Sequence, residues 1–150
     1  MRLSRLQSAM ALAKEVAKRS HDDETQVGCV LVHNQSNAII ATGYNGFVRG
    51  APDGKLPTTR PDKYKYIVHA EMNMVANCAK LGISMDNCTL VCTMSPCITC
   101  ARVLYQCGLT EVIVESLYKD YKELETMNDI TILKTTTDEG YFRLKYEAKE

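Results

Sequence analysis

The chain has 150 residues, about the length of one domain, so we expect a single domain spanning 1–150. Hydrophobic residues make up 45% of it and charged residues 24%, which excludes disordered, collagen-like and membrane-embedded compositions. Because 18 Lys and Arg residues balance 18 Asp and Glu residues, the chain lacks the positive charge on which a general nucleic-acid binder depends. We therefore expect a small-molecule ligand and no nucleic-acid partner.

The cysteine content and the N-terminus indicate the cellular environment. Seven cysteines are an odd number that cannot form a closed set of disulfides, which favours reduced thiols or metal ligands. The apolar run near the N-terminus is interrupted by Lys14 and Glu15, so we expect no cleavable leader. No window approaches the roughly 18 apolar residues of a membrane span. We expect a cytoplasmic protein without membrane contact.

The first third of the chain predicts a helix, a hairpin and a long loop. Ser4 followed by Gln7 fits a capping box, and apolar residues then recur at helical spacing. Two short apolar runs at 27–33 and 38–42 flank the turn sequence Asn-Gln-Ser-Asn and predict a hairpin. Residues 43–65 are rich in Gly, Pro, Asp and Lys without periodicity. Loops of this length inside a domain are usually functional or mobile.

The rest of the chain predicts alternating helices and strands. The expected elements are a helix at 69–81, a strand at 89–93, a helix at 97–107, a strand at 111–115, a helix at 118–127 and a strand at 130–133. Gly82 and Gly108 suit the left-handed ends of two of these helices. We expect an α/β fold with three α/β/α layers and a mixed five-stranded sheet. The tail at 138–150 predicts either a short final helix or a partner-facing segment.

The strongest chemical signal is His-Ala-Glu at 69–71 followed by Pro-Cys-Ile-Thr-Cys at 96–100. His69, Cys97 and Cys100 offer one imidazole and two thiolates, a ligand set for tetrahedral zinc. Three protein ligands leave the fourth position open for water, which is the count of a catalytic site. Cys97 and Cys100 fall on one face of a predicted first helical turn, where the helix N-terminus favours thiolate charge.

Glu71 lies two residues after His69, where it can approach the water and carry its proton without binding the metal. Taken singly, His69 also fits a core or capping histidine, and Glu71 fits a carboxylate at a helix start. Cys-x-x-Cys alone fits a redox pair or half of a structural zinc site. Together and in this order, however, they are the signature of zinc-dependent nucleobase deaminases.

Beyond these motifs the chain resembles the deoxycytidylate (dCMP) deaminase family over nearly its whole length. The matching pieces are residues 25–30 (TQVGCV), 43–46 (GYNG), 66–73 (YIVHAEMN), 96–100 (PCITC) and 108–113 (GLTEVI). The Gly-Tyr-Asn-Gly piece distinguishes this family from tRNA adenosine deaminases and from cytidine deaminases that act on free nucleosides. The resemblance implies a cytidine-deaminase-like fold and zinc-dependent deamination of dCMP to dUMP with release of ammonia, which supplies dUMP for thymidylate synthesis.

The resemblance also implies roles for individual residues. Asn45 would hold the sugar 3′-hydroxyl, although the same residue also fits a turn. The backbone N–H of Ala70 would contact the pyrimidine carbonyl, and the carbonyl of Ser95 would contact the exocyclic amine. The implied phosphate contacts, each of which also fits an ordinary surface residue, are Arg2, Tyr118 and Lys119. Residues 46–66 lack the Cys and His ligands for a second zinc that some relatives carry, so one Zn²⁺ per chain is expected.

Assembly and regulation follow from the resemblance as well. It implies a homo-hexamer that is activated by dCTP and inhibited by dTTP, each bound with Mg²⁺. Residues 46–53 (GFVRGAPD) depart from the commoner Gly-Met-Pro-Asn-Gly-Cys form of the loop that would border the effector sites. Two other interpretations stay open at this point. One is a deaminase acting on another base, such as a tRNA-adenosine or guanine deaminase, and the other is a zinc-binding module without catalytic activity.

Overall fold

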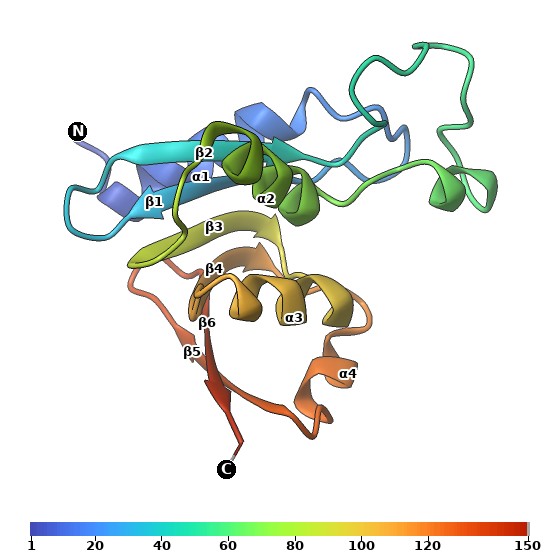
Figure 1. The fold of residues 1–150 in the computed structure, drawn as a ribbon. Coiled ribbons are helices and arrows are strands. Elements are labelled where there is room, and N and C mark those ends of the chain that lie inside the picture. Colours follow the sequence, from blue (N-terminus) through green and yellow to red (C-terminus); the bar gives the residue numbers. More distant parts are fainter. Residues whose placement is uncertain (150) are drawn as a thin grey trace.

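The computed structural model describes residues 1–149 as a twisted sheet with helices on both faces (Figure 1). In chain order the elements are α1 (Arg5–Ala17), β1 (Gly28–His33), β2 (Ile39–Tyr44), η1 (Asp62–Lys65), α2 (Ala70–Leu81), β3 (Cys88–Met94), α3 (Ile98–Gln106), β4 (Glu111–Ser116), α4 (Tyr121–Glu125), β5 (Ile130–Thr136) and β6 (Phe142–Ala148). No helix in this part of the chain is both long enough and apolar enough to cross a membrane.

Helix α1 begins at the capping box that the sequence predicts. The Ser4 hydroxyl accepts a hydrogen bond from the Gln7 backbone N–H at 3.1 Å, and the Gln7 side chain accepts one from the Ser4 backbone N–H at 2.8 Å. The apolar face of α1 then packs on the sheet, where Met10 contributes to a small core with Val30 and Val91. The predicted helix is thus confirmed together with its starting residue.

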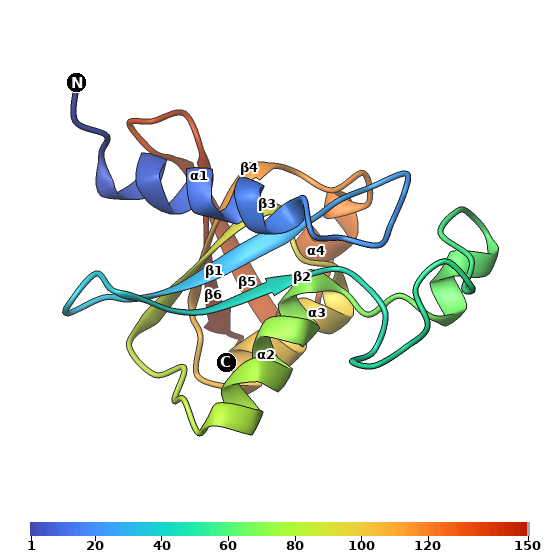
Figure 2. The same ribbon diagram turned by 90° about the horizontal axis from the view of Figure 1, so that it is seen from above.

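The strands lie in the order β2-β1-β3-β4-β6-β5. Strands β3 and β4 are parallel and are connected by α3, whereas every other neighbouring pair is antiparallel. Figure 2 shows α1 on one side of the sheet and α2 with α3 on the other. The three-layer α/β/α fold with a mixed sheet is confirmed.

The sheet has six strands, so the prediction of five is wrong. The tail forms β6, which lies between β4 and β5 and is antiparallel to both. Its sequence alternates apolar Phe142, Leu144 and Tyr146 with charged residues, which is the period-two pattern of a half-buried strand. The tail is therefore neither a helix nor a free segment, because Leu144 and Tyr146 are buried in the core.

The predicted helix at 118–127 is shorter in the structure, where α4 spans only Tyr121–Glu125. Tyr118 lies before this helix, and its backbone N–H donates to the Ser95 hydroxyl at 2.6 Å. This hydrogen bond keeps the start of the connection close to the end of β3. Residues 117–120 are therefore a loop beside α3 and not a helical turn.

Two glycines allow helices to approach the sheet closely. A Cβ atom at Gly43 in β2 would lie 2.3 Å from the Ala70 carbonyl oxygen at the start of α2. A Cβ atom at Gly28 in β1 would lie 2.2 Å from the Ala13 carbonyl oxygen of α1. Both distances are far below van der Waals contact, so only glycine fits at these positions. Gly43 thereby helps to fix where α2 begins.

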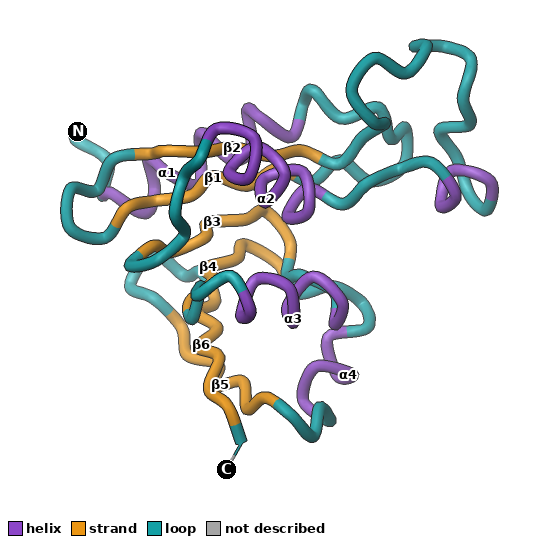
Figure 3. Tube along the Cα trace, viewed as in Figure 1, coloured by secondary structure: helices purple, strands orange, loops and turns teal. Residues whose placement is uncertain are grey.

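The segment between β2 and α2 extends beyond the end of the sheet as a long loop that contains η1 (Figures 1 and 3). The sequence predicts such a loop, but its anchors come from elsewhere in the chain. The His21 ring stacks on Phe47 at 4.7 Å between centroids, and His21 Nδ1 accepts the Phe47 backbone N–H at 3.2 Å. An isolated bridge between Gly46 and Val68 closes the base of the loop.

Candidate active site

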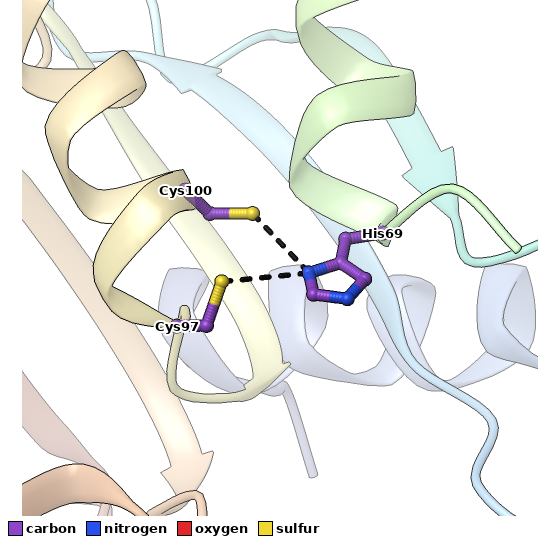
Figure 4. A group of neighbouring side chains, drawn as sticks. All are labelled: His69, Cys97 and Cys100. Atoms are coloured by element: carbon purple, nitrogen blue, oxygen red, sulfur yellow. Dashed lines mark hydrogen bonds between the residues drawn. The ribbon is translucent and has the colours of Figure 1, made fainter. Parts of the chain in front are cut away.

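Two helices begin at the same end of the sheet, and each begins at a proposed metal ligand. His69 is the N-cap of α2 and Cys97 is the N-cap of α3, both with extended backbone. Cys100 lies in the first turn of α3. Figure 4 shows the three side chains pointing toward one another from the two helices. Residues that are distant in the sequence thus meet because two helix N-termini converge.

The distances between the donor atoms fit a tetrahedral metal site. His69 Nδ1 lies 3.5 Å from Cys97 Sγ and 3.4 Å from Cys100 Sγ, and all three donor atoms lie within 4.8 Å of one another. Zinc bonds of ~2.3 Å to sulfur and ~2.0–2.1 Å to nitrogen, at tetrahedral angles, give a nitrogen–sulfur separation of about 3.6 Å. The three residues therefore suit a zinc ion in both chemistry and spacing.

The two thiols of this group differ in their proton affinity. The hydrogen bond with Cys100 lowers the pKa of Cys97 to about 4, and a further hydrogen bond with His69 acts in the same direction. The contact with Cys97 raises the pKa of Cys100, and burial raises it further. Cys97 is therefore a thiolate at neutral pH, which is the form of cysteine that binds metal ions.

Glu71 lies in the first turn of α2 and is only 4% exposed. Burial raises the pKa of its carboxyl above the ordinary value for glutamate. The Cys92 thiol, from the underlying strand β3, donates a hydrogen bond to Glu71 Oε1 at 3.4 Å. A buried carboxylate with raised proton affinity at the wall of a cavity is well placed to accept and return protons.

One cavity of about 270 Å³ brings together most of the residues that the sequence analysis selects. Eight of the ten line it, namely Asn45, His69, Ala70, Glu71, Ser95, Cys97, Tyr118 and Lys119. Cys100 is not among the lining residues, but its sulfur lies 3.4 Å from Nδ1 of His69, which is one of them. Arg2 does not reach this cavity, because it lines a separate cavity between α1 and the sheet, together with Val32 and Thr89.

The Asn45 side chain is held by the backbone that precedes β1. Asn45 Oδ1 accepts the Val27 backbone N–H, and Asn45 Nδ2 donates to the Thr25 carbonyl oxygen, each at 2.8 Å. A side-chain amide has two N–H groups and two acceptor lone pairs, so one of each remains for a ligand. Asn45 is 7% exposed and lines the cavity. Asn45 can therefore both fix the local backbone, as a turn residue does, and contact a ligand.

A buried ion pair forms part of the cavity wall, and the sequence analysis does not identify it. Lys63 Nζ lies 3.0 and 2.8 Å from the two carboxylate oxygens of Asp22, and the side chains are 3% and 4% exposed. Asp22 Oδ1 also accepts the backbone N–H groups of Glu24 and Thr25. The pair thereby connects η1 to the segment whose Thr25 carbonyl holds Asn45.

Burial and hydrogen bonding act in opposite directions on the pKa values of Asp22 and Lys63. Burial alone would raise the pKa of Asp22, but the hydrogen bonds from Lys63 and from two backbone N–H groups outweigh burial and lower it. Burial would likewise lower the pKa of Lys63, and its hydrogen bond to Asp22 instead raises it. Both groups are therefore charged at neutral pH. No local sequence pattern marks either residue, because their contact depends on the tertiary fold.

Comparisons with known proteins agree with this geometry. The profile described as "Cytidine and deoxycytidylate deaminase zinc-binding region" matches residues 3–116. The chain is 39% identical over 114 residues to the probable deoxycytidylate deaminase of Caenorhabditis elegans, covering 73% of this chain and 56% of the relative. It is 38% identical over 113 residues to the deoxycytidylate deaminase of Homo sapiens, covering 71% and 62%. The chain thus spans less than two thirds of these relatives.

A solved structure resembles the fold over most of both chains. The dCMP deaminase of cyanophage S-TIM5, in complex with dCMP and dUMP, superposes with a TM-score of 0.68 at 28% sequence identity. The match covers 83% of this chain and 90% of the phage chain.

The ion pair gives a pH-dependent stability prediction. Lys63→Met should lower the free energy of unfolding at pH 7 by about 3 kcal/mol, because Asp22 stays buried without its partner. Since the pKa of Asp22 is lowered in the folded chain, its stabilising effect is complete above an unfolded pKa of about 3.9 and is lost as pH falls through the folded value. Urea denaturation should therefore show the difference from wild type shrinking below about pH 4.

The matched control is Lys65→Met, which removes an exposed lysine from the same short helix. It should change the free energy of unfolding by less than about 1 kcal/mol, because Lys65 contributes only an exposed contact over the Tyr66 ring. A Lys63→Met protein as stable as wild type at pH 7 would show that the pair makes no net contribution.

Proposed function

The chain belongs to the cytidine and deoxycytidylate deaminase family, and we propose that it converts dCMP to dUMP by hydrolytic deamination with release of ammonia. The observation that carries this proposal is the cluster of His69, Cys97 and Cys100 beside a buried Glu71, at the edge of a cavity that Asn45 also lines. The names of the relatives and the dCMP-bound phage structure support the choice of base and nucleotide.

His69, Cys97 and Cys100 are the residues that would hold zinc, with one ion per chain. An imidazole nitrogen and two sulfurs suit zinc rather than magnesium or calcium, which prefer oxygen ligands. Zinc bound there would supply a Lewis acid that makes water acidic enough to react at neutral pH. The extended backbone at His69 and Cys97 directs both side chains away from their helices and toward the shared position.

Glu71 is the group that moves protons in this proposal. Its carboxylate takes a proton from the attacking water and delivers it to ring nitrogen N3, while the water oxygen bonds to C4. The carboxylate then takes the proton of the new C4 hydroxyl and passes it to the amino group, which leaves as ammonia. Burial supports both steps, because a raised pKa strengthens the carboxylate as a base near neutral pH.

Backbone groups at the two helix starts would orient the base. The first N–H groups of a helix have no partner within it, so Ala70 N–H is available for the pyrimidine carbonyl. The Cys97 N–H, next to the start of α3, would stabilise the negative charge that develops on the C4 oxygen. The Ser95 carbonyl would accept a hydrogen bond from the exocyclic amine. All three residues line the cavity.

Asn45 would hold the sugar 3′-hydroxyl with the donor and acceptor that its backbone contacts leave free. We assign the phosphate to Lys119 and Tyr118, which line the same cavity. Arg2 lines a different cavity, so it would contact this substrate only from a neighbouring copy of the chain.

Assembly, regulation and metabolic role extend the proposal. We infer from the family resemblance that residues 1–150 form one deaminase domain, that the chain forms a homo-hexamer, and that it acts in the cytoplasm. We also propose activation by dCTP and inhibition by dTTP, each with Mg²⁺, and a role in supplying dUMP for thymidylate synthesis. The loop at 46–66, anchored through His21 and Lys63, is the segment that would border the effector sites.

The proton-transfer role predicts the effect of replacing Glu71. Glu71→Ala should bind one zinc per chain and retain its affinity for dCMP, while kcat should fall by at least about 10²-fold, because the proton carrier is lost. Ammonia release from dCMP measures turnover, and atomic absorption measures zinc. Glu15→Ala, an exposed glutamate of α1, is the matched control and should keep wild-type turnover. Loss of zinc from Glu71→Ala would identify Glu71 as a ligand instead.

The phosphate assignment predicts a change in KM that depends on the substrate. Lys119→Ala should raise KM for dCMP about tenfold, because one charge-assisted contact is lost, and it should leave KM for deoxycytidine unchanged. Lys122→Ala, an exposed lysine of α4 outside the cavity, controls for surface charge. Equal effects of Lys119→Ala on both substrates would contradict the assignment.

The regulatory proposal predicts nucleotide responses that depend on Mg²⁺. Steady-state rates with dCMP below KM should rise on addition of dCTP with Mg²⁺ and fall on addition of dTTP with Mg²⁺, and chelation of Mg²⁺ should abolish both responses. Steady-state rates that change with neither dCTP nor dTTP would contradict the proposed regulation but not the proposed reaction.

A further inference from the structure

Cys92, on strand β3, contacts Glu71, the proposed proton carrier on α2. It lies in β3, is fully buried, and donates its thiol hydrogen to Glu71 Oε1 at 3.4 Å. Cys92 is outside the His69, Cys97 and Cys100 group, and a buried free cysteine usually acts as a small apolar side chain. Here the thiol donates a hydrogen bond to a carboxylate oxygen, so the contact has a defined direction and is more than apolar packing.

A second thiol lies beside it under the same helical turn. Cys29 in β1 is the cross-strand neighbour of Cys92 in the antiparallel β1–β3 pair. Its sulfur lies 3.6 Å from the Ala70 carbonyl oxygen as a hydrogen-bond donor, so the two thiols contact consecutive residues of α2. Valine would fill similar space at either position without donating a hydrogen bond. The start of α2 is thus fixed by polar contacts as well as by packing.

We propose that Cys92 is a positioning residue for Glu71: the Cys92 thiol holds Oε1 against β3, so that the other carboxylate oxygen is the one that exchanges protons with water and substrate. This inference rests on the proposed function, because it presumes that Glu71 carries protons. Such a contact would give a carboxylate with two equivalent oxygens a single preferred orientation. An unrestrained carboxylate would spend part of its time in rotamers from which the proton cannot reach the base.

A thiol has the right donor strength for this task. The neighbouring Cys29 thiol and burial raise the pKa of Cys92 well above the ordinary value, so the Cys92 thiol stays protonated and remains a donor. A strong donor would stabilise the charged carboxylate and weaken it as a base. The S–H group is a weak donor, so it orients Glu71 with little loss of basicity.

Infrared spectroscopy tests the contact without any turnover. The S–H stretching band of Cys92 is isolated by subtracting the spectrum of Cys92→Ala from that of wild type, or that of Cys92→Ser if the alanine variant does not fold. Hydrogen bonding to a carboxylate lowers the frequency of this band. In the Glu71→Ala background the same subtraction should show the band at higher frequency. A band at the same frequency in both backgrounds would overturn the proposal.

Kinetics test the consequence. Cys92→Ala should lower kcat for dCMP about tenfold with KM within about twofold of wild type, because only the orientation of the proton carrier changes. Cys92→Ser keeps a donor but a stronger one than a thiol, so kcat should recover to within about threefold of wild type without reaching it. Cys88→Ala, a buried cysteine of the same strand whose thiol contacts the Asp86 carbonyl oxygen, is the matched control and should leave kcat unchanged.

Equal losses in the alanine and serine variants, or unchanged kcat in both, would contradict a positioning role. The infrared and kinetic experiments together distinguish a failure of this inference from a failure of the proposed function. A wild-type protein that does not release ammonia from dCMP contradicts the proposed function, whereas the infrared comparison still decides whether Cys92 holds Glu71.

Discussion

The convergence of two helix N-termini at one end of the sheet is the constraint on which the site depends. Strand β3 leads directly into Cys97 and α3, while the segment after β2 returns to the sheet at His69 and α2. The parallel pairing of β3 with β4 places α3 across the sheet face beside α2. The unpaired N–H groups and positive dipole ends of both helices then point to one place, which favours thiolates and an anionic substrate.

The cavity wall opposite the helices depends on a different kind of interaction. The loop at 46–66 extends beyond the end of the sheet, and the buried pair of Lys63 with Asp22 fixes it to the segment before β1. Through the Asp22 carboxylate, the Thr25 backbone and the Thr25 carbonyl, this pair is connected to the Asn45 amide. A buried ion pair adds little net stability in most proteins, but here it also contacts the backbone segment that holds Asn45.

Local sequence signals predicted the parts of this structure that depend on local interactions. Ser4 with Gln7 marks the start of α1, and the Cys97 and Cys100 spacing places both sulfurs on the first turn of α3. Strand β6 was missed although Phe142, Leu144 and Tyr146 alternate with charged residues, because the segment has no β-branched residue and its place between β4 and β5 depends on long-range pairing. The structure also separates Arg2 from Lys119, which no sequence spacing reveals.

The contacts around Glu71 likewise could not be predicted from the sequence. Cys92 is 21 residues from Glu71 in the chain, and its thiol meets the carboxylate only because β3 runs beneath α2. A buried cysteine in a strand is ordinarily an apolar packing residue, which describes the burial of Cys92 but not its hydrogen bond. Residue types and spacing thus identified candidates for the reaction, whereas the groups that orient those candidates required the three-dimensional structure.

X-ray absorption spectroscopy of the zinc-loaded protein tests the central claim most directly, because it reports the atoms bound to the metal. The account predicts one zinc per chain with two sulfur ligands at ~2.3 Å and two lighter ligands, the His69 nitrogen and an exchangeable oxygen, at ~2.0–2.1 Å. The oxygen contribution should change when dCMP is added. Four protein ligands, or a number of sulfur ligands other than two, would contradict the account.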